Sequence, residues 1–134
     1  MRFLHNIPTL IARQRRLYKA WAQSVSIDFI DCPHERVDNK DSLREFVLKI
    51  TKLIHQRSQG PIYIDRFEDE KLHLAGYTAM ALHDTFSITV HLDEIDNRAF
   101  VDIFSCEEFD LSKVIEFSKE YFAATKVKFT ELER

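Results

Sequence analysis

Hydrophobic residues alternate with polar ones, or run together briefly, in six stretches of the chain. A repeat of two residues is typical of a β-strand, because successive side chains point to opposite faces of the sheet. Charged or turn-forming segments, such as DEIDN at 93–97, separate most of these stretches. The pattern predicts six strands, at residues 24–30, 61–67, 76–83, 86–92, 99–105 and 126–132.

Three other stretches repeat their apolar residues every three or four positions, which is typical of an amphipathic helix. Asp41 or Ser42 is suited to cap the second of these helices. The predicted helix at 8–22 is too short to hold a core of its own, so we expect a helical appendage at 1–23 and one folded domain at 24–134. The repeats predict helices over residues 8–22, 42–57 and 110–123.

The predicted elements follow one another as β-α-β-β-β-β-α-β behind the N-terminal helix. An antiparallel sheet with helices on one face buries the apolar sides of such elements. We therefore predict an α+β fold, a two-layer sandwich in which one face of the sheet carries no helix. That face must hold a site or be covered, and dimerisation through sheet faces or edges would cover it.

Composition narrows the class of protein. The 134 residues suit one domain, with 45% apolar and 31% charged residues. Two glycines are too few for a glycine-rich phosphate-binding loop. No apolar stretch approaches the roughly 18 residues that cross a bilayer, and Cys32 and Cys106 form no C-x-x-C pair. These features indicate a soluble, cytoplasmic protein with two free thiols and no membrane partner.

Charge is distributed unevenly along the chain. The net charge is −3, yet residues 1–23 contain no acidic residue and five basic ones: Arg2, Arg13, Arg15, Arg16 and Lys19. We expect a basic helix that lies on an acidic body, its own or that of a partner subunit, with an organellar transit peptide as the lesser alternative. Because no base-reading or stacking residues accompany the arginines, we expect no binding to nucleic acid.

The stretch from residue 76 to residue 106 carries a set of spaced residues. GYT (76–78) begins one predicted strand, and AFVDIFSC (99–106) fits the pattern A-x-hydrophobic-D-hydrophobic-F-T/S-C. His91 lies fifteen residues before Cys106. In these residues the chain resembles the prokaryotic S-adenosylmethionine decarboxylases of polyamine synthesis. The resemblance covers 24–134, with a weaker match at SIDFIDC (26–32), and does not cover the N-terminal segment.

The resemblance implies a fold, a reaction and a cofactor. In this family a serine attacks the carbonyl of the residue before it, and the chain splits. The new N-terminus is a pyruvoyl group, which serves as the electron sink for decarboxylation of S-adenosylmethionine. By resemblance, His91 assists the elimination, Cys106 reprotonates the substrate carbon, and the hydroxyl of Thr78 assists processing or catalysis. A homodimer without a metal is the implied assembly.

The chain departs from the family at the processing site. Five residues before His91 stands Phe86 in place of the serine, with Thr85 in place of the preceding glutamate. Phenylalanine has no β-hydroxyl, so no pyruvoyl group can form there. Thr85 would give a bulkier 2-oxobutanoyl group. Ser87 has the right chemistry, but a shift of one residue along a strand turns it to the opposite face unless a bulge restores its direction.

Three interpretations remain open. The chain is a divergent decarboxylase of spermidine synthesis processed at an unusual residue, or a non-catalytic homologue, or a general α+β interaction module whose N-terminal helix docks on a partner. A non-catalytic homologue would bind S-adenosylmethionine or a related small molecule, or regulate an active paralogue. The missing serine favours this second interpretation.

Each candidate residue also has a structural interpretation. Taken alone, His91 is a half-buried strand histidine, Cys106 a small core residue, and Asp102 a hydrogen-bond partner within the sheet. Two short pairs contain metal-ligand residue types without further ligands at a fixed spacing, which is too little to predict a metal site. These pairs are His83 with Asp84 and Cys32 with His34.

Overall fold

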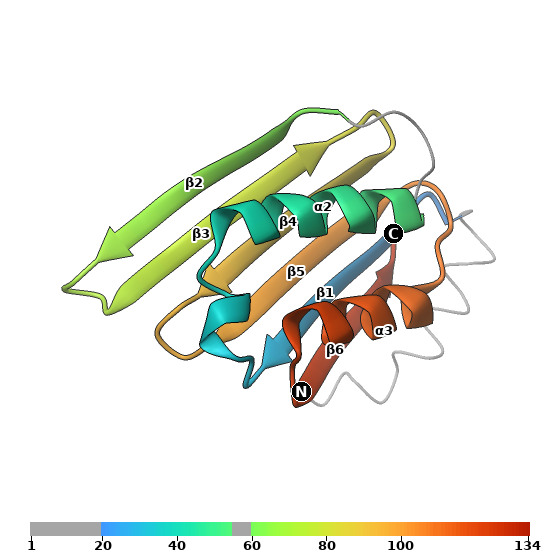
Figure 1. The fold of residues 1–134 in the computed structure, drawn as a ribbon. Coiled ribbons are helices and arrows are strands. Elements are labelled where there is room, and N and C mark those ends of the chain that lie inside the picture. The colour runs from blue at the N-terminus through green and yellow to red at the C-terminus, as the bar shows by residue number, and fades with distance from the viewer. Residues whose placement is uncertain (1–19, 55–59) are drawn as a thin grey trace, which may run out of the picture.

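The computed structural model describes residues 20–54 and 60–134. Within these ranges the helices are η2 (His34–Arg36, a 3-10 helix), α2 (Lys40–Ile54) and α3 (Leu111–Phe122) (Figure 1). The strands are β1 (Gln23–Ile30), β2 (Ile62–Asp69), β3 (Leu74–Leu82), β4 (Phe86–Asp93), β5 (Arg98–Ser105) and β6 (Lys126–Glu133). All six predicted strands are confirmed, each with both ends within two residues of the prediction.

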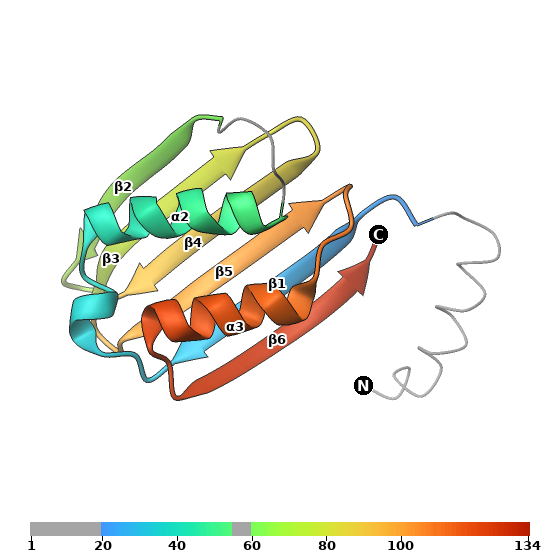
Figure 2. The same cartoon turned by 45° about the vertical axis from the view of Figure 1, so that its right-hand side comes forward.

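The strands form one antiparallel sheet in the order β2-β3-β4-β5-β1-β6. Strands β2 to β5 are neighbours in sequence and in space, whereas β1 lies between β5 and the C-terminal β6. Helices α2 and α3 both lie on one side of the sheet, which we call the helix face (Figures 1 and 2). Among the described residues the other side, the open face, carries no helix. The predicted two-layer α+β fold is confirmed.

The core lies between the two helices and the helix face. Alternate residues of the inner strands supply it, and on β1 these are Val25, Ile27 and Phe29, each 2% exposed or less. Helix α2 contributes the stripe expected from its repeat, and Phe46 in that stripe is fully buried. The Phe46 ring lies where α2 meets α3, with its centroid 4.6 Å from that of Phe122. One apolar core thus holds both helices on the sheet.

The second predicted helix starts at a different cap. Helix α2 begins at Lys40, and Asn39 Oδ1 accepts the Ser42 N–H at 2.9 Å. An N-cap side chain binds the N–H two or three residues further on, so Asn39 is the cap and the choice of Asp41 or Ser42 was wrong. Residues 55–57, predicted as the end of this helix, lie outside the described part of the chain.

Most of the predicted N-terminal helix, residues 8–19, lies outside the described residues. The prediction is wrong for its last three residues, because 20–22 are not helical. The N–H groups of Trp21 and the next residue donate to the carbonyl of Arg134, at 2.7 and 3.2 Å. Pairing with the end of β6 overrides the helical repeat here, since tertiary hydrogen bonds outweigh local propensity.

Candidate functional site

Successive residues of β4 face opposite sides of the sheet, and this alternation separates the predicted processing position from the predicted catalytic histidine. Phe86 is 2% exposed and belongs with Ile88 and Val90 on the helix face. Ser87 and His91 follow Phe86 by one and five residues, which are odd numbers, so their side chains point to the open face. The predicted processing position and the predicted catalytic histidine therefore lie on opposite faces of one sheet.

On the open face, His91 stands directly opposite Thr78 of β3. Thr78 Oγ1 and His91 Nδ1 are 2.9 Å apart, a hydrogen bond that orients the imidazole ring. Gly76 lets the backbones of β3 and β4 approach closely, because a Cβ there would lie 1.8 Å from the carbonyl oxygen of Leu92. The fold thus brings together two of the predicted site residues, Thr78 and His91.

The turn between β3 and β4 holds the predicted processing site. Phe86 is the first residue of β4 and pairs with Ser105 of β5. Its ring lies beside that of His83, with centroids 5.6 Å apart. The carbonyl oxygen of Thr85 accepts the N–H of Cys106 at 2.8 Å. The carbonyl that a nucleophile at position 86 would attack is therefore held and polarised, but the residue at that position offers only a phenyl ring.

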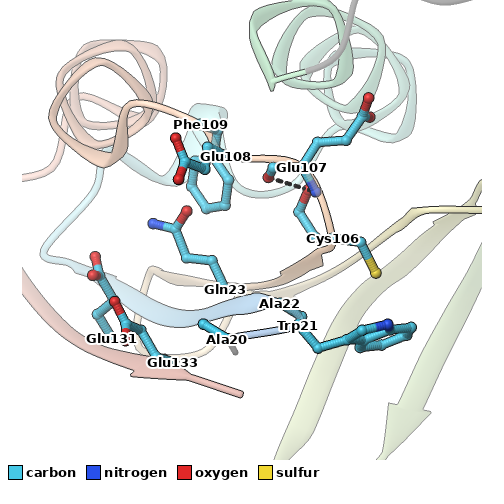
Figure 3. Close-up of a pocket in the computed structure, with 11 residues that line it drawn as sticks. Ala20, Trp21, Ala22, Gln23, Cys106, Glu107, Glu108, Phe109, Glu131 and Glu133 are labelled. Atoms are coloured by element: carbon cyan, nitrogen blue, oxygen red, sulfur yellow. Dashed lines mark hydrogen bonds between the residues drawn. The ribbon is translucent and has the colours of Figure 1, made fainter. Parts of the chain in front are cut away.

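Cys106 lies beside a hollow of about 400 Å³ at one end of the sheet (Figure 3). Residues 20–23 form part of its wall, and Cys106 is half-buried. The connection between β5 and α3 is fixed by Ser105 Oγ, which donates to the carbonyl of the second residue after it at 2.7 Å. An acid-lined hollow beside a thiol suits a cationic ligand. Four of the residues that line it are acidic: Glu107, Glu108, Glu131 and Glu133.

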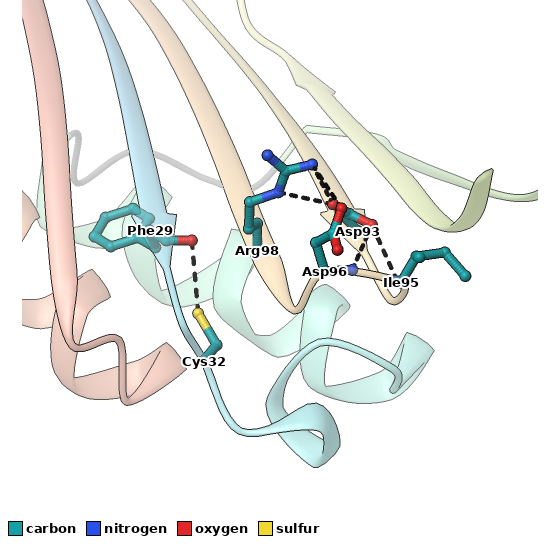
Figure 4. Close-up of polar contacts among 6 residues, drawn as sticks. All are labelled: Phe29, Cys32, Asp93, Ile95, Asp96 and Arg98. Carbon is teal, nitrogen blue, oxygen red and sulfur yellow. Dashed lines mark hydrogen bonds and ion pairs between the residues drawn. The ribbon is translucent and has the colours of Figure 1, made fainter. Parts of the chain in front are cut away.

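A polar cluster fixes the turn between β4 and β5 (Figure 4). Asp93 Oδ1 accepts two backbone N–H groups of the turn at 3.0 and 3.2 Å, and Asp93 Oδ2 accepts from Arg98 Nε at 2.8 Å. Asp93 and Arg98 are also opposite each other in the ladder. The cluster therefore sets the β4–β5 register, and with it the places of His91 and Cys106.

One chain does not bring all the candidates together. His91 is five residues from Phe86, roughly 16 Å along a strand of ordinary rise. Cys106, in contrast, immediately follows the residue that pairs with Phe86. Phe86, Thr85 and Cys106 thus form one group at the end of the sheet, and Thr78 with His91 forms a second group further along β4.

Cys32 and Asp102 have structural surroundings. Cys32 is 5% exposed, and its Sγ donates to the carbonyl of Phe29 at 3.6 Å (Figure 4). Burial, and to a lesser extent the charge of Asp31, raises the pKa of the Cys32 thiol to about 11, so this thiol stays protonated near neutral pH. Asp102 accepts a hydrogen bond from Ser26 Oγ at 2.6 Å, as its structural interpretation expects.

The structure does not gather the short pairs weighed as metal ligands. Within residues 20–54 and 60–134, no three His, Cys, Asp or Glu side chains are grouped so that they could hold a metal ion. His34 Nδ1 lies 2.9 Å from Asn97 Oδ1, and Cys32 Sγ donates to the carbonyl of Phe29. In the same ranges, no helix has the length and apolar character that spanning a membrane requires.

Sequence reasoning missed the acid-lined hollow. Glu107 and Glu108 are adjacent, and Glu131 and Glu133 alternate along the last strand, but nothing local shows that the two pairs meet. They meet because β1 lies between β5 and β6, with Gln23 pairing to one residue of each. Only that order of strands could have revealed the site.

Comparison with known proteins agrees with the fold. A solved adenosylmethionine decarboxylase from Aquifex aeolicus VF5 superposes with a TM-score of 0.71 at 18% identity, over 87% of this chain and 92% of that one. This likeness places the chain in a structural class of two-layer α+β proteins. Two curated proteins from Clostridium botulinum, from strains Langeland and Okra, are each described as an S-adenosylmethionine decarboxylase proenzyme. Each is 24% identical over 109 residues, 81% of this chain and 89% of the relative.

The family model for S-adenosylmethionine decarboxylase matches residues 23–134, which is most of the chain. The chain belongs to the S-adenosylmethionine decarboxylase family.

Proposed function

We propose that this chain is an unprocessed, non-catalytic member of its family, which keeps the fold and a ligand-binding hollow but forms no pyruvoyl group. One observation carries the proposal. Phe86 occupies the first position of β4 with its side chain in the core, so no hydroxyl is available at the processing position. A phenyl group can neither accept an acyl group from the preceding carbonyl nor undergo β-elimination.

The neighbouring hydroxyls are poor substitutes. Ser87 points to the open face, on the opposite side of the sheet from the Phe86 side chain. The ladder from Phe86 to Asp93 is regular, with no bulge that would turn Ser87 round. Thr85 Oγ1 donates to Glu107 Oε2 at 3.1 Å, so the proton of this hydroxyl is already engaged with a carboxylate.

The proposed ligand is S-adenosylmethionine or a related cationic small molecule of polyamine biosynthesis. S-adenosylmethionine carries a sulfonium and an ammonium group, and the carboxylates of the hollow would attract both charges. Cys106 borders this hollow, as expected if the ligand site of the family is retained. Two features support this ligand: its positive charges complement the carboxylates of the hollow, and the thiol of Cys106 lies beside the same hollow.

We also propose a homodimer formed through the open face. Tyr63, Met80 and Leu82 lie together there and are 56%, 39% and 46% exposed. A second copy would bury these side chains, and would bring its own Thr78–His91 pair over the first copy. That would unite two groups of residues that one chain keeps apart. An active paralogue of the same fold would dock on the same surface, and would give the chain a regulatory role.

Thermal unfolding with S-adenosylmethionine tests the ligand. A ligand that binds only the folded state at about 100 times its Kd raises stability by about 2.7 kcal/mol, or roughly 8 °C in Tm for a domain of this size. We expect a rise of this order without release of carbon dioxide. The double variant Glu131→Gln/Glu133→Gln should lose most of the rise, and Glu116→Gln on α3 should keep it.

Two results would contradict the proposal. Turnover of S-adenosylmethionine to its decarboxylated product would show a working decarboxylase. An unchanged Tm at saturating concentration would favour the third interpretation, an α+β interaction module that does not bind this ligand.

A further inference from the structure

The connection from β1 to α2, residues 31–39, is tied to a turn that lies far away in the sequence. The N–H of Cys32 donates to the carbonyl of Asn97, in the turn between β4 and β5, at 3.0 Å. The side chains meet as well, since His34 Nδ1 lies 2.9 Å from Asn97 Oδ1. The polar cluster of this turn sets the β4–β5 register. Residues 31–39 therefore support the turn on which that register depends.

The imidazole of His34 has an acceptor at each of its two nitrogens. Asn97 Oδ1 lies at Nδ1, and Asp38 Oδ2 lies 3.5 Å from Nε2. A protonated ring donates from both nitrogens, whereas a neutral ring has a single N–H. A neutral ring can keep both contacts only if the Asn97 amide turns round to donate, and it then has no charge with which to attract Asp38. The site therefore fits the imidazolium better than the neutral ring.

The charges that act on His34 from both segments are acidic. Asp38 and Glu35 belong to its own connection, and Glu94 belongs to the β4–β5 turn. The hydrogen bond with Asn97 is the main reason that the pKa of His34 is raised above its ordinary value of 6.5. Loss of hydration opposes the rise, and the three carboxylates add to it. The other charged side chains of the two segments bond elsewhere: Asp31 to Thr125, Arg36 to the carbonyl of Tyr121, and Asp93 and Asp96 to Arg98.

We propose that His34 is a proton-operated latch, whose imidazolium ties residues 31–39 to the β4–β5 turn and whose neutral form loosens that tie. The pKa of His34 is higher in the folded chain than in the unfolded one. The stabilisation is therefore fully present below about pH 6.5 and is lost as the pH rises through the folded-state pKa. The His34 side chain is 57% exposed, so solvent screens the contact and the response is modest. The latch does not rest on the proposed function.

The first test titrates the histidines of the full-length protein by NMR. The signal of His34 is the one that disappears in His34→Gln. We expect this signal to titrate above pH 6.5 in the parent. It should move to lower pH in Asp38→Asn, which removes a charge, and in Asn97→Gly, which removes the acceptor. Glycine suits the φ of 54° at this position, so the turn keeps its path. His73→Gln in the β2–β3 hairpin is the matched control and should leave the His34 titration unchanged.

The second test measures the tie itself by hydrogen exchange at the Cys32 N–H, which donates to the Asn97 carbonyl. Each exchange rate is compared with that of an unstructured peptide at the same pH, which gives a protection factor. We expect protection in the parent to fall about threefold from about pH 6 to about pH 8, the scale of one exposed charge contact. In His34→Gln it should stay constant. Equal pH dependence in the two proteins, or a His34 signal that titrates at or below pH 6.5, would overturn the inference.

Discussion

Replacing Phe86 with serine is expected to split the chain into residues 1–85 and 86–134. The structure already holds the carbonyl of Thr85 with the N–H of Cys106 at 2.8 Å. A donor at this carbonyl would stabilise the oxyanion formed when a hydroxyl at position 86 attacks. The variant therefore restores the hydroxyl that self-processing requires at position 86. Denaturing mass spectrometry would detect both fragments, with a keto-acid cap on the downstream one.

The matched control for this experiment is Phe86→Ala. It leaves a cavity similar to that of the serine variant in a side chain that is 2% exposed, and we expect each variant to lose about 3–5 kcal/mol of stability. Only the serine variant offers a hydroxyl, so only it should be cleaved. If circular dichroism shows that Phe86→Ser is folded while its chain stays whole after long incubation, the assignment of position 86 to the processing serine is wrong.

Phe46→Ala is expected to destabilise the protein by about 3–5 kcal/mol, a large part of the stability of a domain of this size. Phe46 is fully buried and joins the two helices. Its ring centroid lies 4.6 Å from that of Phe122, 5.3 Å from that of Tyr121 and 6.1 Å from that of Phe117. Removing the ring would leave a cavity under both helices and end these contacts, and urea unfolding followed by circular dichroism would measure the loss.

Leu53→Ala on the same helix serves as the comparison for Phe46→Ala. Leu53 is 43% exposed, so its truncation removes little buried surface and should cost less than about 1 kcal/mol. Similar losses for the two variants would mean that the interface between α2 and α3 contributes less than its packing indicates.

The strands were predictable from sequence because their side-chain repeat is local. In the inner strands the burial pattern follows the alternation of their own residues, as in β4, where Phe86 is buried and Ser87 is not. Phe86 and His91 are separated by five residues, an odd number, which already implied that their side chains lie on opposite faces of the sheet. Helix caps were less predictable, since Asn39, Asp41 and Ser42 all have suitable side chains and only the backbone path selects one.

Features that depend on distant pairing could not be predicted. The last residues of the predicted N-terminal helix instead pair with Arg134, more than a hundred positions away. The hollow likewise needs the ends of three strands, and the insertion of β1 between β5 and β6 is not visible in any local pattern. Thr78 and His91 were identified by resemblance, but their hydrogen bond follows from the β3–β4 register.

The mass of the purified, denatured protein gives the most direct test of the proposal that Phe86 prevents processing. A single species at the full mass of 15.9 kDa is the result we expect, because nothing at that position can start the acyl shift. Two shorter species would contradict it, if the chain had been cleaved between residues 84 and 87 and the downstream fragment carried a keto-acid group at its new N-terminus.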